Sequence, residues 1–228
     1  MEEDIMKKRF LVFMVAILAL SLMVFALSAC NDDTKGDAEV LRFAVPDGTP
    51  ALSVAGLIAS GATVGGKKIE LEIINPSLIG GEVLSEKADI AILPTNAAAQ
   101  LYNRGAKYKL VTSNVFGVLY LIGKENPEGF TLDKLIGKRV SSIGQSNTPQ
   151  FVFEKILKET FGGDIIVNNS QSAVEGKIVI NYVADGASAI AAVNTGNADY
   201  AIVGEPAVTN AEKAGFKPLY DLQAAWAQ

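Results

Sequence analysis

Residues 88–92 and 198–202 carry nearly the same pentapeptide, 110 residues apart. The first is Ala-Asp-Ile-Ala-Ile and the second is Ala-Asp-Tyr-Ala-Ile, and each is followed by a proline-containing turn and an alanine-rich helical stretch. From Val40 onward, short β-branched runs alternate with helical stretches, which is typical of α/β folds. We therefore predict an α/β fold of two similar lobes. Chance similarity between two strands rich in Ala and Ile is the alternative.

Hydrophobic periodicity sets the expected elements. Strands are expected at 41–45, 68–74, 89–93 (fully buried), 138–143, 177–183 and 198–203. Helices are expected from an N-cap Thr49 with Pro50 at the next position to about residue 60, shortly after 75–77, at 95–103, from Thr148 through Phe161, at 186–194 and from 206 to about 213.

The run 108–123 is long and strand-like, broken around Ser113-Asn114, and it is expected to carry the chain between the lobes. We therefore place the first lobe at 40–112 and the crossover with the second lobe at 113–220. Residues 221–228 are expected to begin a return toward the first lobe.

The amino-terminal segment 1–29 has the pattern of an export signal. A basic run at 7–9 precedes an almost unbroken apolar run at 10–29, and small residues lead to Cys30, the only cysteine of the chain. This pattern resembles a bacterial lipoprotein signal, in which the cysteine is lipidated. Residues 30–39 are then a polar tether. The alternatives are a retained membrane anchor and an accidental cysteine, and the sequence does not choose between starts at Met1 and Met6. Either membrane interpretation puts the globular part outside the cytoplasm.

The composition excludes several chemistries. The chain has no His, which removes Ser-His-Asp and Cys-His nucleophile pairs and His-ligated metal centres. One Cys makes neither an intrachain disulfide nor a multi-cysteine metal site. A formal net charge of −5 argues against nucleic acid as a partner, because phosphate binding needs clustered Lys and Arg. We expect no metal and no cofactor.

Three threonines begin predicted helices: Thr49, Thr95 and Thr148. Unpaired backbone N–H groups and the positive end of the dipole make such positions favourable for an anionic group. Each threonine taken alone is better explained as a helix cap, but three such starts at the same sheet edge favour a site that some of them line. None of the preceding turns is a P-loop or a GxGxxG motif, so nucleotide binding is not predicted.

Two motifs carry a family resemblance: Thr-Leu-Asp-Lys-Leu-Ile-Gly-Lys-Arg-Val at 131–140 and Asn-Thr-Gly-Asn-Ala-Asp-Tyr-Ala-Ile-Val-Gly-Glu-Pro at 194–206. Together with the lipoprotein-like signal, they resemble the solute-binding proteins of ABC importers for nitrate, sulfonates, taurine and thiamine precursors. The resemblance implies a two-lobed, type II periplasmic-binding-protein-like fold that closes on a small polar or anionic organic solute. It also implies permease subunits as partners, a monomeric binder and a lipid-anchored position on the outer face of the cytoplasmic membrane.

The ligand loops of that family fall on three groups of residues. In the first lobe and the crossover they are Asp47, Gly48, Thr49, Pro94, Thr95, Asn96, Ser113 and Asn114, and in the second lobe they are Gln145, Ser146, Asn147, Thr148, Asp185 and Glu205. Neutral donors suit an anionic or zwitterionic solute, whereas the three carboxylates suit an ammonium or ring nitrogen. The carboxylates are also explained as turn or cap residues. A phosphate or sulfonate is commonly bound by Arg, but the sequence does not clearly place Arg104 or Arg139 in the cleft.

Two other functions stay open. Enzymes use the same fold, but one class needs His and the other acts in the cytoplasm. A ligand sensor that does not transport its ligand is indistinguishable at this level, and the solute itself is not identified.

The length adds one expectation. Cys30–Gln228 is 199 residues, and two complete lobes usually need more. The family returns to the first lobe after the second, so we expect a C-terminally truncated chain.

Overall fold

The structure is a computed structural model that describes residues 40–61 and 63–227. The predicted signal peptide at 1–29, the predicted lipidation site Cys30 and the predicted tether at 30–39 lie outside the described residues. Within the described part of the chain, no helix is both long enough and apolar enough to cross a membrane.

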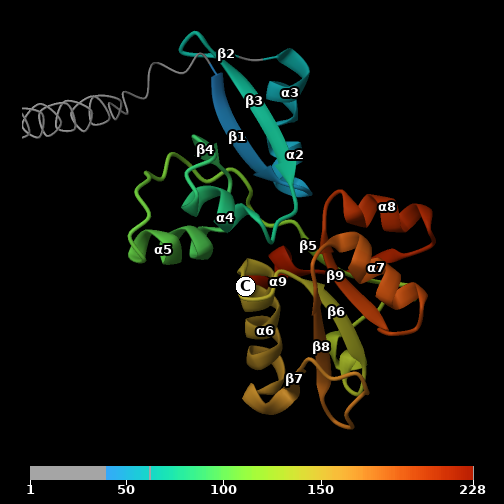
Figure 1. The fold of residues 1–228 in the computed structure, drawn as a ribbon. Coiled ribbons are helices and arrows are strands. Elements are labelled where there is room, and N and C mark those ends of the chain that lie inside the picture. Colours follow the sequence, from blue (N-terminus) through green and yellow to red (C-terminus); the bar gives the residue numbers. More distant parts are fainter. Residues whose placement is uncertain (1–39, 62, 228) are drawn as a thin grey trace, which may run out of the picture. The chain divides into compact units, whose positions relative to one another are not determined.

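The first sheet consists of β1 (Val40–Pro46), β2 (Thr63–Val64), β3 (Lys67–Ile74) and β4 (Ile90–Ala91), in the order β2-β3-β1-β4 (Figure 1). Strands β3, β1 and β4 are parallel, and the short β2 is antiparallel to β3. Alternating apolar residues of β1 and β3 place Phe43, Val45 and Leu71 on one face, where they form a small core.

The helices described in this lobe are α2 (Thr49–Ser53), α3 (Ala55–Ser60), α4 (Ile79–Leu84) and α5 (Thr95–Asn103). The helix predicted from Thr49 to residue 60 is broken, because Val54 leaves the helical conformation at φ −114° and ψ 11° and joins the core. Thr49 is also not an N-cap. Gly48 occupies that position, at φ 98°, and no side chain caps the helix.

The second sheet consists of β5 (Leu119–Gly123), β6 (Arg139–Ile143), β7 (Ile166–Asn168), β8 (Ile178–Val183), β9 (Tyr200–Gly204) and β10 (Lys217–Asp221), in the order β10-β5-β9-β6-β8-β7. Strands β9, β6, β8 and β7 are parallel, while β5 runs antiparallel to both of its neighbours, β9 and β10. The sequence did not indicate β7 or β10 as strands.

Helices cover both faces of the second sheet (Figure 1). They are α6 (Thr148–Phe161), α7 (Gly186–Asn194), α8 (Ala207–Lys213) and α9 (Leu222–Trp226), with short 3-10 turns η1 (Leu132–Leu135) and η2 (Gly163–Ile165). Phe153 and Leu157 of α6 are buried in one core and Phe161 packs against it, as the i, i+4, i+8 spacing predicts. The other core lies under α7 and α8, around Ala201 and Val203.

The two sheets share one arrangement. In each, one parallel strand lies between two later ones: β1 between β3 and β4, and β6 between β8 and β9. The duplicated aspartate makes the same contacts twice. Asp89 accepts a hydrogen bond from the backbone N–H of Arg42 at 2.9 Å and faces its Nε at 3.5 Å. Asp199 accepts one from the N–H of Arg139 at 2.8 Å and faces its Nε at 3.7 Å. The two-lobed α/β prediction is confirmed.

Three expectations about segments need correction. The strand expected at 89–93 is paired only over Ile90–Ala91 and is half-buried. The strand expected at 108–123 forms only at 119–123, because no partner strand lies beside 108–118 within the described residues. Residues 222–226 form α9, whose Leu222 is fully buried in a core of the second sheet. This stretch therefore packs on the second lobe instead of leaving it.

Candidate functional site

The loop after β1 reaches the loop after β9. Thr49, the first residue of α2, donates its hydroxyl to the backbone carbonyl of Glu205 at 2.5 Å. A Cβ on Gly48 would lie 3.8 Å from the same carbonyl oxygen, and one on Gly204 would lie 3.4 Å from the Thr49 hydroxyl. Both loops lie at carboxyl ends of parallel strands, where open α/β sheets bind ligands. Asp47 is exposed, and its Oδ1 accepts a local hydrogen bond from the N–H of Gly48.

The loop after β4 reaches the loop after β6 through one amide side chain. The Nδ2 of Asn96 donates to the carbonyl of Ser146 at 3.0 Å, and its Oδ1 accepts from the hydroxyl of Thr148 at 3.4 Å. Asn96 lies in the first turn of α5 and Thr148 is the first residue of α6. The first turns of two helices from different lobes are thus joined by neutral hydrogen-bonding groups.

The loop after β6 holds its shape by local bonds. Ser146 has a left-handed backbone at φ 59°, and its N–H donates to Oε1 of Gln150 at 2.6 Å. Asn147 donates from Nδ2 to the carbonyl of Gln145 at 3.4 Å, and the Gln145 side chain is exposed. The position of Ser146 is therefore set by Gln150, a residue that the sequence did not single out.

The predicted crossover residues occupy an irregular segment. Ser113 and Asn114 are both exposed and belong to no strand, where the sequence predicts a break in the strand-like run. Asn114 still reaches the first lobe, since its Nδ2 donates to the hydroxyl of Ser53 at 2.9 Å. Ser53 follows Thr49 by one helical turn on α2, and that spacing is the one signal by which the sequence could have indicated it.

Two of the predicted carboxylates serve helix ends. Asp185 is the N-cap of α7, with Oδ1 accepting from the N–H of Ser188 at 2.8 Å, and that hydrogen bond lowers the pKa of Asp185. The Oε2 of Glu205 accepts from the N–H and the hydroxyl of Thr209 in α8, at 3.1 and 2.9 Å. The carbonyl of Glu205, not its carboxylate, meets the first lobe. The cap interpretation therefore describes both side chains.

The remaining predicted positions lie either at the start of α5 or at the far end of β6. Pro94 precedes α5 as its N-cap residue and Thr95 is exposed at the first helical position. Arg139 lies at the start of β6, the opposite end of the strand from the loops, and its Nη2 donates to the carbonyl of Gly196 at 2.8 Å. The hydrogen bonds of the described residues thus unite Thr49 with Glu205 and Asn96 with Ser146 and Thr148. They do not connect Ser113 or Asp185 to that set.

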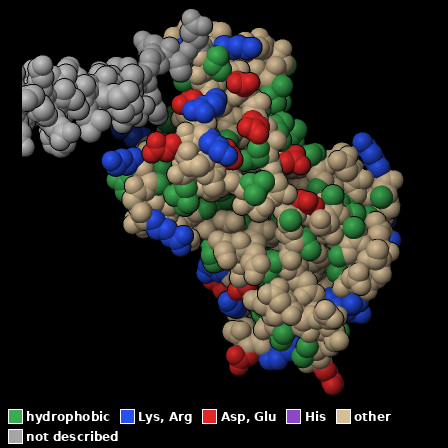
Figure 2. All heavy atoms as spheres, viewed as in Figure 1, with side chains coloured by type: hydrophobic (Ala, Val, Ile, Leu, Met, Phe, Trp, Pro, Cys, Tyr) green, Lys and Arg blue, Asp and Glu red, His purple; other side chains and the backbone are tan. Residues whose placement is uncertain are grey.

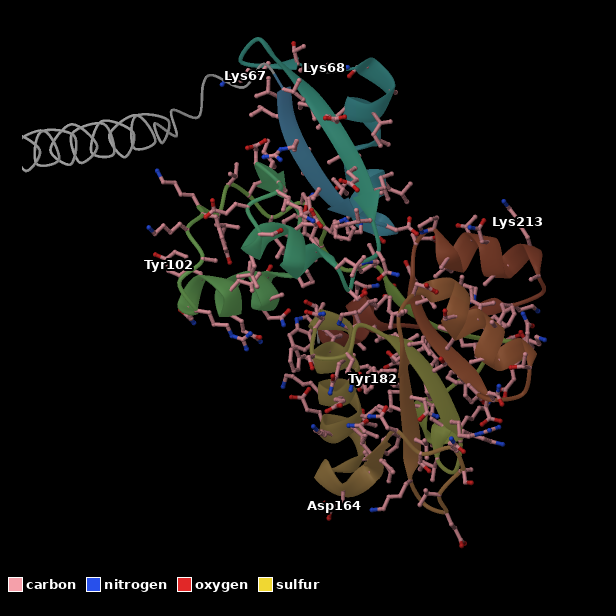
Figure 3. The ribbon with its side chains drawn as sticks, in the orientation of Figure 1. Lys67, Lys68, Tyr102, Asp164, Tyr182 and Lys213 are labelled. Atoms are coloured by element: carbon pink, nitrogen blue, oxygen red, sulfur yellow. The ribbon has the colours of Figure 1, made fainter. Side chains whose placement is uncertain are left out.

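A shallow hollow along α6 is a separate feature. It is lined by Phe151, Glu154, Lys155, Lys158 and Glu159. Burial raises the pKa of Glu154, but hydrogen bonds from Lys158, Gln150 and others, including the hydroxyl of Tyr182 at 3.0 Å, together lower it. Tyr182, a residue of β8, is labelled in Figure 3. Burial likewise raises the pKa of Tyr182 above its usual range. These groups satisfy one another and one helix supplies the whole lining, so we assign no site there.

The chemistry of the loops is neutral. Hydroxyls, amides and backbone carbonyls supply the contacts between the lobes, and charged side chains of both signs are interspersed on the face shown in Figure 2. Among residues 40–61 and 63–227, no group of three or more Cys, Asp or Glu side chains is placed to hold a metal ion. Such loops can hold a small polar molecule by hydrogen bonds alone.

No protein-family model and no curated protein matches the chain. Solved structures do match it. An ABC transporter protein from Parabacteroides distasonis has a TM-score of 0.61 at 22% identity, covering 81% of this chain and 59% of that one. A zinc-bound ligand-binding component of an ABC-type import system from Staphylococcus aureus has a TM-score of 0.61 at 17% identity, covering 82% and 62%. The periplasmic aliphatic sulphonate binding protein SsuA from Escherichia coli has a TM-score of 0.54 at 16% identity, covering 81% and 61%.

The fold is that of the periplasmic binding proteins. The likeness rests on both sheets together, since these matches cover about four fifths of the chain. At these identities it establishes the architecture, and the periplasmic-binding-protein-like prediction is confirmed at that level. The chain spans 59%, 62% and 61% of the lengths of these three structures, so it holds about three fifths of what each of them contains.

Proposed function

We propose that this chain is the extracytoplasmic solute-binding component of an ABC importer, tethered by a lipid on Cys30, and that it is not an enzyme. The observation that carries the proposal is the meeting of loops from two sheets. Asn96 bonds Ser146 and Thr148, and Thr49 bonds Glu205. These residues all follow carboxyl ends of strands, where ligands bind in open α/β sheets.

We infer the solute class from the groups in these loops. The first turns of α5 and α6 contain no acidic residue, and both present backbone N–H groups that lack helical partners. The carboxylate of Glu205 is occupied by Thr209. A small anionic or zwitterionic organic molecule, of the sulfonate, nitrate or thiamine-precursor class, fits these donors better than a cation does.

A ligand screen tests the proposal. The full chain, purified in mild detergent, is heated with panels of sulfonates, amino acids, pyrimidines and oxyanions. A true solute at 100 times its Kd should stabilise the folded state by about 2.7 kcal/mol. A folded sample that responds to no member of these panels would contradict solute binding.

Two variants locate the site. Asn96→Ala and Thr148→Val should weaken the response to the solute, because each removes a hydrogen-bonding group shared by both lobes. Asn210→Ala, an exposed asparagine on α8, is the matched control and should leave the response intact. A response that survives Asn96→Ala would still support solute binding, but it would show that the solute does not bind at these loops.

The lipid anchor has its own test. Cells that express the full chain should incorporate labelled palmitate, and Cys30→Ala should abolish the label. Label that persists in the Cys30→Ala variant would reject the anchor without touching the proposal about the solute.

A further inference from the structure

Three side chains of the second lobe form a line of hydrogen bonds. Ser146, Gln150 and Glu154 follow one another at four-residue spacing, from the loop before α6 into that helix. The N–H of Ser146 donates to Oε1 of Gln150 at 2.6 Å, and Nε2 of Gln150 donates to Oε1 of Glu154 at 2.8 Å. An ionised carboxylate only accepts hydrogen bonds, so it fixes the amide nitrogen of Gln150 on its own side. The amide oxygen is thereby left to face Ser146.

The carboxylate of Glu154 is held by donors from several elements. Its Oε1 also accepts from the hydroxyl of Tyr182 in β8 at 3.0 Å and from Nδ2 of Asn168 in β7 at 3.2 Å. Its Oε2 accepts from Nζ of Lys158, one turn further along α6, at 2.9 Å. The side chain of Glu154 is only 13% exposed. Burial raises its pKa, but these hydrogen bonds lower the pKa overall, so the carboxylate is charged at neutral pH.

The other end of the line is the contact between the lobes. Ser146 is exposed and has a left-handed backbone at φ 59°, which is uncommon for a residue other than glycine. Its carbonyl accepts from Nδ2 of Asn96 at 3.0 Å, and Oδ1 of Asn96 accepts from the hydroxyl of Thr148 at 3.4 Å. A left-handed conformation costs free energy and persists where neighbouring contacts hold it. The bond to Gln150 is such a contact.

Helix capping explains part of this arrangement. Gln150 is the third residue of α6, a position from which Gln and Glu side chains commonly bond back to the backbone before the helix. Capping accounts for the bond to Ser146. It does not account for Glu154, because that carboxylate is mostly buried and collects donors from β7 and β8. These donors tie the loop before α6 to the sheet of the second lobe.

We propose that Glu154 is a positioning residue of the candidate site, which acts through Gln150 to hold the loop 144–147 against Asn96. Glu154 does not touch the solute. This inference rests on the proposed function, because the loop that it positions is the part of the second lobe that meets Asn96. The direction of the Ser146 carbonyl then depends on an acceptor eight residues further along the chain.

NMR on the full chain in mild detergent, without any solute, tests the positioning. The measured quantities are hydrogen exchange of the Ser146 N–H and the side-chain NH₂ signals of Asn96. Glu154→Ala should accelerate exchange at Ser146 roughly fivefold, the effect of losing one ordinary hydrogen bond. It should also move the Asn96 signals toward those of a free amide. Glu154→Leu, which keeps the bulk of the side chain, should have the same effects.

Two matched variants separate the acceptor from the charge and from the helix. Glu154→Gln keeps an acceptor oxygen but removes the charge, so it should retain the slow exchange at Ser146 and the Asn96 signals. Lys158→Ala removes the donor to the other carboxylate oxygen and should also leave both unchanged. Exchange of amides 153–157 in α6 reports whether the helix is folded in each variant. A role limited to helix stability would change these amides and would not be rescued by Glu154→Gln.

Titration with ethanesulfonate connects the position of the loop to binding. Glu154→Ala should raise the Kd about fivefold, because the Ser146 carbonyl no longer holds Asn96 in place. Glu154→Gln should change the Kd by less than about twofold. If the wild-type chain responds to no member of the screened panels, the proposed function fails, and the NMR measurements still decide whether Glu154 positions the loop.

Three results would overturn the inference. One is exchange at Ser146 that is equal in Glu154→Ala, Glu154→Leu and the wild-type chain. Another is exchange that is as fast in Glu154→Gln as in Glu154→Ala, which would assign the effect to the charge and not to the acceptor. The last is an unchanged Kd for ethanesulfonate together with faster exchange at Ser146, because the loop would then move without consequence for the solute.

Discussion

The two lobes begin alike and end differently. The parallel strands β3-β1-β4 and β8-β6-β9 share one order and one Arg–Asp contact. Within the described residues, however, the second sheet has six strands with a core on each face, and the first has four strands with one small core. The nearly identical strands at 88–92 and 198–202 differ in burial for that reason. Burial of a strand is therefore decided by what lies beside it, and its own residues supply only the capacity to be buried.

The largest expected contrast comes from matched core deletions. Ile202→Ala should destabilise the second lobe by about 2–5 kcal/mol, because it empties a fully buried position. Ile92→Ala, at the equivalent position, should cost less than half of that, since water already reaches its side chain.

Separate probes are needed for the two lobes. Trp226, the only tryptophan of the chain, lies in α9 on the second lobe, and its fluorescence in a urea titration follows Ile202→Ala. Exchange of β1 amides follows Ile92→Ala. Equal losses at the two positions would contradict the link between neighbouring strands and burial.

The duplicated aspartates give the next contrast. Asp199→Ala removes the acceptor for the N–H of Arg139, and an unsatisfied, partly buried donor costs about 1–3 kcal/mol. Asp89→Ala should cost less, because the hydrogen bond from the N–H of Arg42 lies at an exposed position and the one from the N–H of Arg139 is partly buried. Water can thus replace the lost partner more fully in the first lobe. The same two probes measure both variants, and a larger loss for Asp89→Ala would reverse the comparison.

The sequence predicted most of the architecture, because periodicity and the duplicated pentapeptide report local structure. The strands β1, β3, β6 and β8 and the helices α5, α6 and α7 lie within a residue or two of their expected bounds. The predictions that failed depend on which other strands lie beside a segment. The run 108–123 has strand propensity throughout, but only 119–123 has partners, and propensity does not reveal whether a partner exists.

The candidate site was predictable as loops and not as contacts. The resemblance placed Thr49, Asn96 and Thr148 at carboxyl ends of strands, where they lie. It did not reveal that the carboxylate of Glu205 turns to Thr209 while its carbonyl meets Thr49, because a backbone carbonyl leaves no mark in a sequence. Gln150, which fixes Ser146, is likewise one polar residue among many until the loop is folded.

The turns after β8 and β3 should differ in how their contribution to stability depends on pH. Asp185 follows β8 and caps α7, and Asn75 follows β3 and accepts from the N–H of Ser77 at 3.0 Å. Asp185→Ala should cost about 1 kcal/mol at neutral pH. Because the hydrogen bond from Ser188 lowers the pKa of Asp185 below its unfolded value of about 3.9, the charge-dependent part of that stability is present above pH 4. It disappears as the pH falls through the folded pKa.

Urea titrations from pH 7 down to pH 2 measure this effect. Asn75→Ala should change the stability of the first lobe by an amount that does not vary with pH, since an amide does not titrate. Asp185→Asn is the control, because it keeps an oxygen acceptor while removing the charge. An Asp185→Ala loss that stays constant across the range would show that the charge is not involved.

The smallest expected effect lies at a buried serine. Ser141 of β6 is buried among the apolar side chains beneath α7, and its hydroxyl has no hydrogen-bond partner among the described groups. The equivalent residue of β1 is Ala44, two positions after Arg42, as Ser141 is two positions after Arg139. Ser141→Ala should therefore be neutral or should stabilise the second lobe by up to about 1 kcal/mol, because it removes a desolvated hydroxyl without emptying a large volume. The reverse change, Ala44→Ser, should destabilise the first lobe. A clear loss of stability in Ser141→Ala, measured by the fluorescence of Trp226, would mean that the hydroxyl has a partner, such as a buried water molecule, and that the two sheets differ at this position for a structural reason.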